Sequence, residues 1–200
     1  MNTKKNIAVF ASHGGSDLQA IIDGCKMGNI NACVCVVISN NSNSMALQRA
    51  KNENIPAVHI SEKTAGDSLR KVMLDTLLSH ETDIIFLAGY LKKMPDNVLE
   101  TFNNRVFNIH PSLLPKYGGK GMFGINVHKA VIEAGETETG ITIHRVTAEY
   151  DTGEILAQKK VPVYAADTPE ILAARVLEQE HIFIVEFLAK IFEKSEGFSC

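Results

Sequence analysis

The feature that most restricts the fold is the alternation of short apolar runs with helix-like segments through the first half of the chain. Apolar residues recur at helical spacing in two segments: Leu18, Ile21, Ile22 and Cys25, then Leu69, Val72, Met73 and Leu77. Strand-like runs flank them at NIAVFAS, Ala32–Ser39, PAVHI and DIIFLAG, and NNSNS supplies a turn and cap before a helix over Met45–Asn52. DIIFLAG lacks polar alternation, as expected for a central parallel strand covered on both faces. The pattern predicts a parallel sheet between layers of helices.

The second half departs from this rhythm. We expect a helix over 95–102, the strand RVFNIH, a loop at GGKGMFG, and a helix over 127–134 closed by Gly135. ETGITIHRV alternates polar and apolar residues, which predicts an antiparallel strand with EILAQKKVPV as its partner. Asp167, Pro169 and Glu170 form a capping signature before a long helix that runs to about residue 194. The expected architecture is one domain over residues 1–200, a Rossmann-like α/β fold whose central sheet is mostly parallel and whose carboxyl-terminal part is mixed.

Composition argues against two classes of partner. The net charge of -3 over 200 residues lacks the basic excess typical of nucleic-acid-binding proteins. No apolar run approaches the roughly 20 residues needed to span a bilayer, and MNTKKNIAVFAS has too short an apolar stretch for a secretory signal. We therefore expect a cytoplasmic protein that binds small molecules and neither nucleic acid nor membrane.

The four cysteines are expected to be buried, reduced thiols. Cys33 and Cys35 share one face of a strand in CVCVVIS, Cys25 lies on the apolar side of a helix, and Cys200 is the last residue. A metal site would need a second ligand pair at suitable spacing, and none is visible. We expect no bound metal.

The segment SHGGSDLQAI follows the first strand and opens the first helix. In open α/β sheets, ligands bind beyond the carboxyl ends of the strands, and a helix amino terminus attracts anions. Phosphate is the natural ligand for such a loop, although the dinucleotide pattern of three spaced glycines is absent. The alternative is a tight turn in which Ser16 or Asp17 caps the helix.

The tripeptide NIH at the end of a strand is more informative. Asn108 and His110 point to the same face of the strand, and Pro111 cannot continue the ladder. An amide N–H can stabilise a developing oxyanion, and an imidazole can donate or relay a proton near neutral pH. The pair therefore suits a carbonyl reaction. The alternative is a histidine that satisfies a local hydrogen bond.

An acid in EYDTGEIL completes the set of candidates. Asp151 lies in a turn between two expected strands, where Asp before Thr-Gly is commonly a turn former. It becomes catalytic if the fold brings it beside His110, where a carboxylate would favour the imidazolium. No serine or cysteine occupies a nucleophile elbow, so covalent catalysis has no candidate.

These motifs, SHGGSDLQAI, LAGYLKKMP, NIHPSLLPKY and DTGEILAQKKVPV, occur in an order that resembles the phosphoribosylglycinamide formyltransferases of purine synthesis. The resemblance runs from Ile7 to about residue 192, and NIHPSLLP is its most specific part. It implies transfer of a formyl group from 10-formyltetrahydrofolate, the cosubstrate, to the amino group of glycinamide ribonucleotide. The amine would attack the formyl carbon directly.

The resemblance also implies roles for individual residues. Asn108 would bind the formyl oxygen, His110 would act as a general acid or charge stabiliser, and Asp151 would raise the pKa of His110. The ribonucleotide would contact the glycine loop and an acid that binds the ribose hydroxyls: Gly14, Gly15, Ser16, Asp17 and Glu180. The folate would contact Asn108 and the segment Leu91, Lys92, Lys93 and Met94, together with the backbone around Asp151.

Three departures from the family pattern matter. Asp17 stands where asparagine is usual, which puts a carboxylate near the expected phosphate. GGKGMFGINVH is longer than the matching loop of shorter bacterial forms and suggests a flap over the substrates. The arginine expected near the folate glutamate tail has no clear counterpart, and Arg70 is the candidate.

Related activities remain alternatives. Methionyl-tRNA formyltransferase would carry an additional carboxyl-terminal nucleic-acid-binding domain. Formyltetrahydrofolate deformylase, a hydrolase, would carry an amino-terminal regulatory domain and tends to have histidine where this chain has Pro111. A folate- or nucleotide-sensing module would have vestigial catalytic residues, whereas Asn108, His110 and Asp151 are intact. The oligomeric state is expected to be a monomer or a homodimer.

Overall fold

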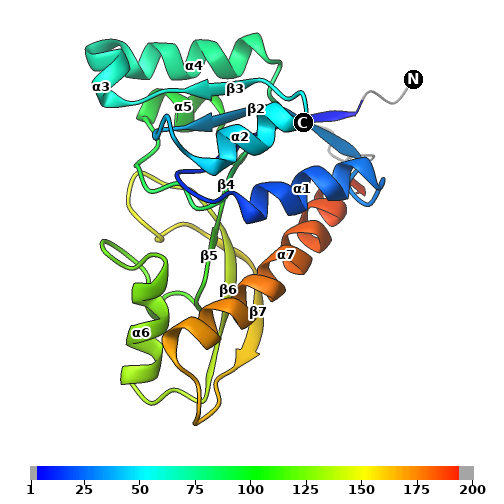
Figure 1. Ribbon diagram of the computed structural model, residues 1–200. Helices are drawn as coiled ribbons and strands as arrows, with labels where there is room; N and C mark the ends of the chain where they lie inside the picture. The colour runs from blue at the N-terminus through cyan, green and yellow to red at the C-terminus, as the bar shows by residue number, and fades with distance from the viewer. Residues whose placement is uncertain (1–3, 194–200) are drawn as a thin grey trace.

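The computed structural model describes residues 4–193, in which one sheet lies between two layers of helices (Figure 1). The strands are β1 (Lys5–Phe10), β2 (Ala32–Ser39), β3 (Ala57–His59), β4 (Ile84–Leu87), β5 (Val106–His110), β6 (Glu138–Arg145) and β7 (Ile155–Pro162). The helices are α1 (Ser16–Lys26), α2 (Met45–Asn52), α3 (Glu62–Ala65), the 3-10 turn η1 (Gly66–Ser68), α4 (Leu69–Ser79), α5 (Asp96–Thr101), α6 (Ile125–Glu133) and α7 (Pro169–Glu193).

The seven strands are ordered β3-β2-β1-β4-β5-β6-β7. The first five of these are parallel to their neighbours, whereas β6 runs antiparallel to both β5 and β7. The predicted fold class, a mostly parallel α/β sheet with a mixed carboxyl-terminal part, is confirmed. The strand reversal has a direct consequence for the site, because it pairs Asn108 of β5 with His144 of β6.

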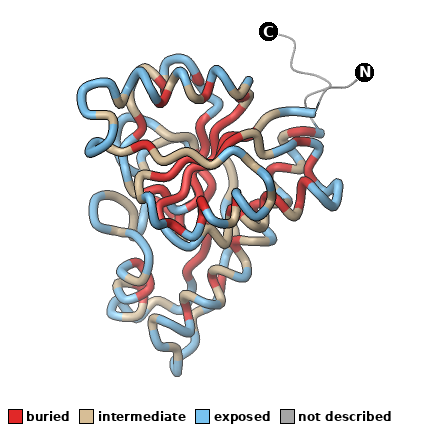
Figure 2. The backbone as a smooth tube through the Cα atoms, turned by 45° about the horizontal axis from the view of Figure 1, so that its top comes forward, coloured by how far each residue is buried: buried red, intermediate tan, exposed pale blue. Residues whose placement is uncertain are grey.

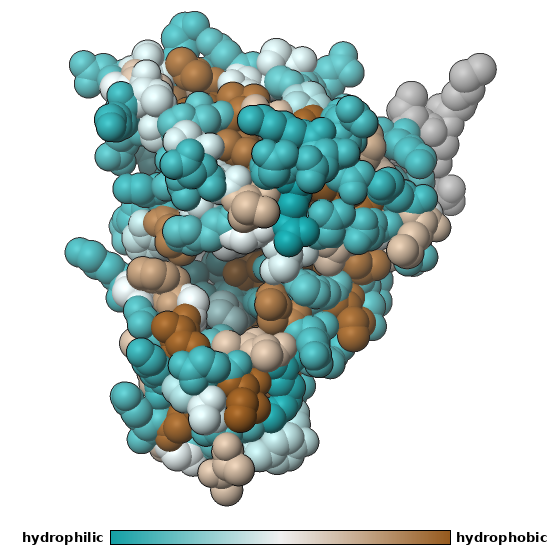
Figure 3. Space-filling view, in the orientation of Figure 1, coloured by the Kyte–Doolittle hydropathy of each residue, from teal (hydrophilic) through white to brown (hydrophobic). Residues whose placement is uncertain are grey.

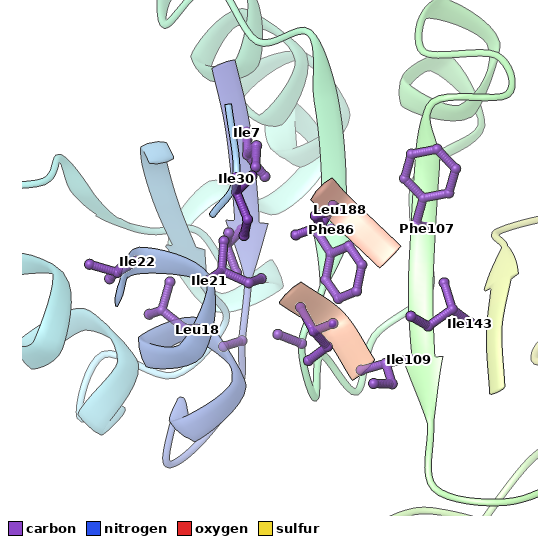
Figure 4. Packing of buried hydrophobic residues seen from close by; sticks show 14 of the residues in the cluster. Ile7, Leu18, Ile21, Ile22, Ile30, Phe86, Phe107, Ile109, Ile143 and Leu188 are labelled. Atoms are coloured by element: carbon purple, nitrogen blue, oxygen red, sulfur yellow. The ribbon is translucent and has the colours of Figure 1, made fainter. Parts of the chain in front are cut away.

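Each face of the sheet carries its own core. Helices α1, α2, α6 and α7 cover one face, where Leu18 and Leu188 pack with Ile7, Phe86 and Phe107 (Figure 4). Helices α4 and α5 cover the other face through side chains such as Met73 and Val98. Alternate strand residues therefore enter different cores, and the buried chain is concentrated in the central strands (Figure 2).

The start of α1 differs from the prediction that Ser16 or Asp17 caps it. The N-cap is Gly15, whose backbone is left-handed at φ 69°, and no side chain accepts a hydrogen bond from the first turn. A Cβ at Gly15 would lie 2.9 Å from Ala46, so this close approach of the loop to α2 requires glycine. The Asp17 carboxyl is thus not used as a cap.

The starts of α2 and α7 can also be compared with the prediction. Ser44 caps α2 by accepting from the Leu47 N–H, as the NNSNS turn predicts. At the start of α7, Thr168 rather than Asp167 accepts from the first turn, and Asp167 instead pairs with Arg175 at 2.6 Å. The short elements α3 and η1 lie in a segment without apolar periodicity and were not predicted.

The prediction of buried cysteines is wrong for one of the three that the structure describes. Cys25 is buried and Cys35 is half-buried, but Cys33, near the amino end of β2, belongs to neither core and is exposed. All three are free thiols, and Cys200 lies outside the described residues. Among residues 4–193, no helix is both long and apolar enough to cross a bilayer, and no three side chains form a metal-binding group.

Candidate active site

A cavity of about 380 Å³ opens at the carboxyl ends of β4 and β5. The segment after β4, the end of β5, the loop 118–124 and the turn after β6 line it, and Asp17 and Glu180 close one side. The space-filling view is hollowed in this region, between the part that carries α6 and the elements above it (Figure 3). This is where an open α/β sheet is expected to bind a ligand.

Asn108 is oriented by a histidine on the neighbouring strand. The Nδ1 atom of His144 lies 2.8 Å from the carbonyl of Arg145, and because a carbonyl only accepts, Nδ1 carries the hydrogen. In the neutral ring, Nε2 then accepts, and the Asn108 amide donates to it at 3.0 Å. One N–H of the Asn108 amide is therefore used to fix its rotamer, and the other remains for a ligand oxygen.

His110 is buried, and one of its ring nitrogens is hydrogen-bonded to the backbone. Its Nε2–H donates to the Tyr117 carbonyl at 2.7 Å, and Nδ1 lies 3.7 Å from Asp151 Oδ2. Burial lowers the pKa of His110, and the opposing effect of the Asp151 carboxylate does not fully offset it. Asp151 thus acts to raise this pKa, as the resemblance implies, but burial has the larger effect and the net pKa is lowered, so the ring is neutral at pH 7 with a free lone pair on Nδ1.

Asp151 is held in the turn after β6 by its backbone and by the loop that faces it. Its φ of 55° is in the left-handed region, which aspartate tolerates better than most residues. Oδ2 accepts from the Gly119 N–H at 2.8 Å, and Oδ1 lies 3.5 Å from His144 Nε2. Burial raises the pKa of Asp151, but the neighbouring His144 and His110 rings and the hydrogen bond from the Gly119 N–H together outweigh it, so the pKa is lowered and the carboxylate is ionised.

His144 is the site residue that the sequence analysis missed. It is only 2% exposed and it touches both Asn108 and Asp151. The available signal was a histidine at an inward position of the alternating run ETGITIHRV. Its importance depends on the strand register, Asn108 opposite His144, which residue patterns alone do not provide.

The glycine loop approaches the site through one residue. Asp17 lines the cavity, whereas Gly14, Gly15 and Ser16 do not. Arg49 of α2 donates to the Gly14 carbonyl at 2.9 Å and brings a cation to this loop. Glu180 of α7 also lines the cavity, so the two expected ribonucleotide acids do converge. The contacts of the three loop residues with substrate stay predictions.

The expected folate segment lines the same cavity. Leu91, Lys92, Lys93 and Met94 all contribute to its wall, and the Leu91 N–H donates to the buried Ser12 hydroxyl at 3.0 Å. Arg70 lies elsewhere: it pairs with Asp96 at 3.5 Å and lines neither this cavity nor the cleft beside it.

That adjoining cleft, of about 650 Å³, shares Lys92 and Lys93 with the cavity and adds Lys63. Lys93 pairs with Glu149 at 3.0 Å and Glu62 also lines the cleft, so the positive charge of the three lysines is partly offset. A carboxylate-bearing tail that extends from the cavity would meet these side chains.

Comparison with known proteins identifies the family. The formyl transferase family model matches residues 5–188. The chain is 43% identical over 194 residues to the chloroplastic phosphoribosylglycinamide formyltransferase of Arabidopsis thaliana, covering 96% of this chain and 66% of that protein. It thus spans slightly less than two thirds of the plant relative.

A bacterial relative and a solved structure indicate the same family. Phosphoribosylglycinamide formyltransferase of Escherichia coli K12 is 40% identical over 181 residues, covering 88% of this chain and 82% of that protein. The crystal structure of glycinamide ribonucleotide transformylase 1 from Symbiobacterium toebii superposes with a TM-score of 0.88 at 34% identity, covering 96% of this chain and 90% of the other.

Proposed function

Because the chain belongs to the formyl transferase family, we propose that it transfers the formyl group of 10-formyltetrahydrofolate to the amino group of glycinamide ribonucleotide in de novo purine biosynthesis. The observation that carries the proposal is the convergence of Asn108, His110, His144 and Asp151 on one cavity. An amide donor, a neutral imidazole and a carboxylate suit direct attack of an amine on a carbonyl carbon. No covalent enzyme intermediate is required.

Asn108 would stabilise the charge that develops on the formyl oxygen. As the amine nitrogen bonds to the formyl carbon, the carbonyl oxygen gains negative charge, and an N–H fixed beforehand costs little reorganisation. His144 holds the Asn108 amide in place at 3.0 Å, which supports this role. Collapse of the tetrahedral carbon then breaks its bond to the folate nitrogen.

His110 would carry the proton between the two nitrogens. The attacking nitrogen must lose a proton and the departing folate nitrogen must gain one, so the reaction is balanced if one group relays it. The neutral Nδ1 of His110 can accept this proton. The resulting imidazolium is stabilised by Asp151, whose carboxylate oxygen lies 3.7 Å from Nδ1.

The two substrates would approach from opposite sides. We assign the ribonucleotide to the loop and acids Gly14, Gly15, Ser16, Asp17 and Glu180, beside the cation of Arg49. The pterin would contact Leu91 and Met94 in the apolar part of the cavity, and the glutamate tail would extend toward Lys63, Lys92 and Lys93. The enzyme would act in the cytoplasm on small molecules alone, as a monomer or a homodimer.

A coupled assay with and without the ribonucleotide tests the proposal. We expect tetrahydrofolate to be released only when glycinamide ribonucleotide is present, with formyl product formed in equal amount. Asn108→Ala should slow this turnover by about a hundredfold or more while the ribonucleotide still binds. Equal release without the ribonucleotide would mean that the protein is a hydrolase and would refute the proposal.

A further inference from the structure

Two largely buried carboxyl groups share one wall of the cavity. Asp17 lies in the first turn of α1 with its side chain 13% exposed, and Glu180 lies on α7 and is 8% exposed. Oδ1 of Asp17 is buried without a hydrogen-bond partner, and no hydrogen bond or ion pair to the Glu180 carboxyl is found among residues 4–193. Both acids are therefore available to a ligand in the cavity.

The surrounding charges do not neutralise this pair. His181 of α7 approaches Asp17 Oδ1 to 3.5 Å with Nε2, but makes no hydrogen bond to it. Burial, and then the charge of Arg49, lower the pKa of His181, so its ring is neutral at pH 7. Arg49 of α2 itself donates to the Gly14 carbonyl and to Gln19.

Two unpaired carboxylates in a buried wall cannot both ionise at low cost. Burial raises the pKa of Asp17 to about 6. Burial, and then the charge of Asp17, raise the pKa of Glu180 well above its usual value. Both acids are thus easier to protonate than exposed carboxyls, and the pKa of Asp17, about 6, lies close to physiological pH.

A phosphate placed at the amino end of α1 would meet the Asp17 carboxyl. An ionised carboxylate repels a phosphate dianion, whereas a neutral carboxylic acid presents an O–H that a phosphate or ribose oxygen can accept. Resting on the proposed function, we infer that Asp17 binds the ribonucleotide as a neutral carboxylic acid and that substrate binding takes up a proton from solvent at this residue. Asp17 is then a residue that determines how affinity depends on pH.

Calorimetric titration of the protein with glycinamide ribonucleotide tests the inference. Titrations in buffers of different ionisation enthalpy, between pH 6.5 and 8.5, give both Kd and the number of protons taken up. Asp17→Asn is the matched variant, because the amide keeps the shape of the neutral acid and cannot titrate. Ionisation of the substrate's own amine and phosphate contributes equally to both proteins, so the difference reports on residue 17.

We expect the wild type to take up more protons than Asp17→Asn above pH 7. The ratio of the wild-type Kd to the variant Kd should rise with pH, by up to about tenfold per pH unit. Carbon-13 NMR of aspartate carboxyls in the wild type, free and bound, provides a readout that does not depend on how well the variant folds. The Asp17 signal should move toward the protonated position on binding.

Equal proton uptake, parallel Kd curves and an unmoved Asp17 signal, with the ribonucleotide bound in every titration, would overturn this inference and leave the proposed function intact. Absence of ribonucleotide binding to either protein would overturn the proposed function, and the inference with it.

Discussion

At the scale of single residues, the orientation of Asn108 is set by a neighbour and not by its own strand. The Arg145 carbonyl fixes which nitrogen of His144 carries hydrogen, and the other nitrogen fixes the Asn108 amide. His144 is accordingly a positioning residue in the proposed reaction. Replacing His144 should therefore change turnover by changing the orientation of the Asn108 amide.

Replacing His144 by phenylalanine tests this dependence. We expect turnover to fall by about tenfold to a hundredfold, because the amide loses its fixed rotamer. The double variant with Asn108→Ala should be little slower than Asn108→Ala alone, as for residues that act as a unit. The measurement is kcat for the four proteins of the cycle.

Ile143→Val provides the matched control, since Ile143 is the neighbouring residue of β6 and packs in the core on the opposite face of the sheet. Fully additive losses in the cycle would show that His144 acts independently of Asn108.

At the scale of elements, the turn between β6 and β7 connects two parts of the site. Gly153 packs so closely on Arg145 that a Cβ there would overlap the Arg145 carbonyl oxygen. That same carbonyl accepts from His144, and the same turn carries Asp151 in its left-handed conformation. One glycine therefore sets the position of both side chains.

We predict that Gly153→Ala lowers turnover by more than tenfold and also lowers the melting temperature, because the turn must move away from β6. Thr152→Ala is the control: it removes a hydroxyl that bonds to Thr147 and Glu149 in the same turn, without adding a Cβ beside Arg145. Activity and thermal unfolding are measured on the three proteins. Wild-type turnover in Gly153→Ala would contradict this account of the turn.

The periodicity of apolar residues decides which helices and strands could be predicted from the sequence. The apolar run at β4 and the stripe at Leu18, Ile21 and Ile22 report burial directly, so the parallel sheet and α1 follow from the sequence. Elements α3 and η1 bury no residue, so no periodic signal exists for them. His144 could not be predicted as a site residue because its role depends on the long-range register of β5 and β6. The direction of the net pKa shift of His110 depends on burial, which a motif does not report.

At the scale of the whole molecule, the buried acid Asp17 is expected to cost stability. Its pKa is raised from 3.8 to about 6, so between these values the folded state binds the proton more tightly than the unfolded chain. Stability therefore falls as pH rises through this window and stays lower above it. A shift of this size corresponds to about 3 kcal/mol at most.

Asp17→Asn should accordingly raise the free energy of unfolding at pH 7.5 by up to about 3 kcal/mol, and the gain should narrow at pH 4.5. Urea denaturation at the two pH values measures it, with Asp23→Asn on the same helix as the control for removing one charge. A gain that is the same at both pH values would show that Asp17 ionises in the fold as freely as in the unfolded chain.

The reversal of direction between β5 and β6 has one more consequence. Asn108 and His144 belong to adjacent strands of a continuous hydrogen-bonded ladder, so no hinge separates them. These two side chains therefore need no closure of one lobe on another to come together when a substrate arrives. In the proposed reaction, the Asn108 amide would already be aligned once the polypeptide has folded.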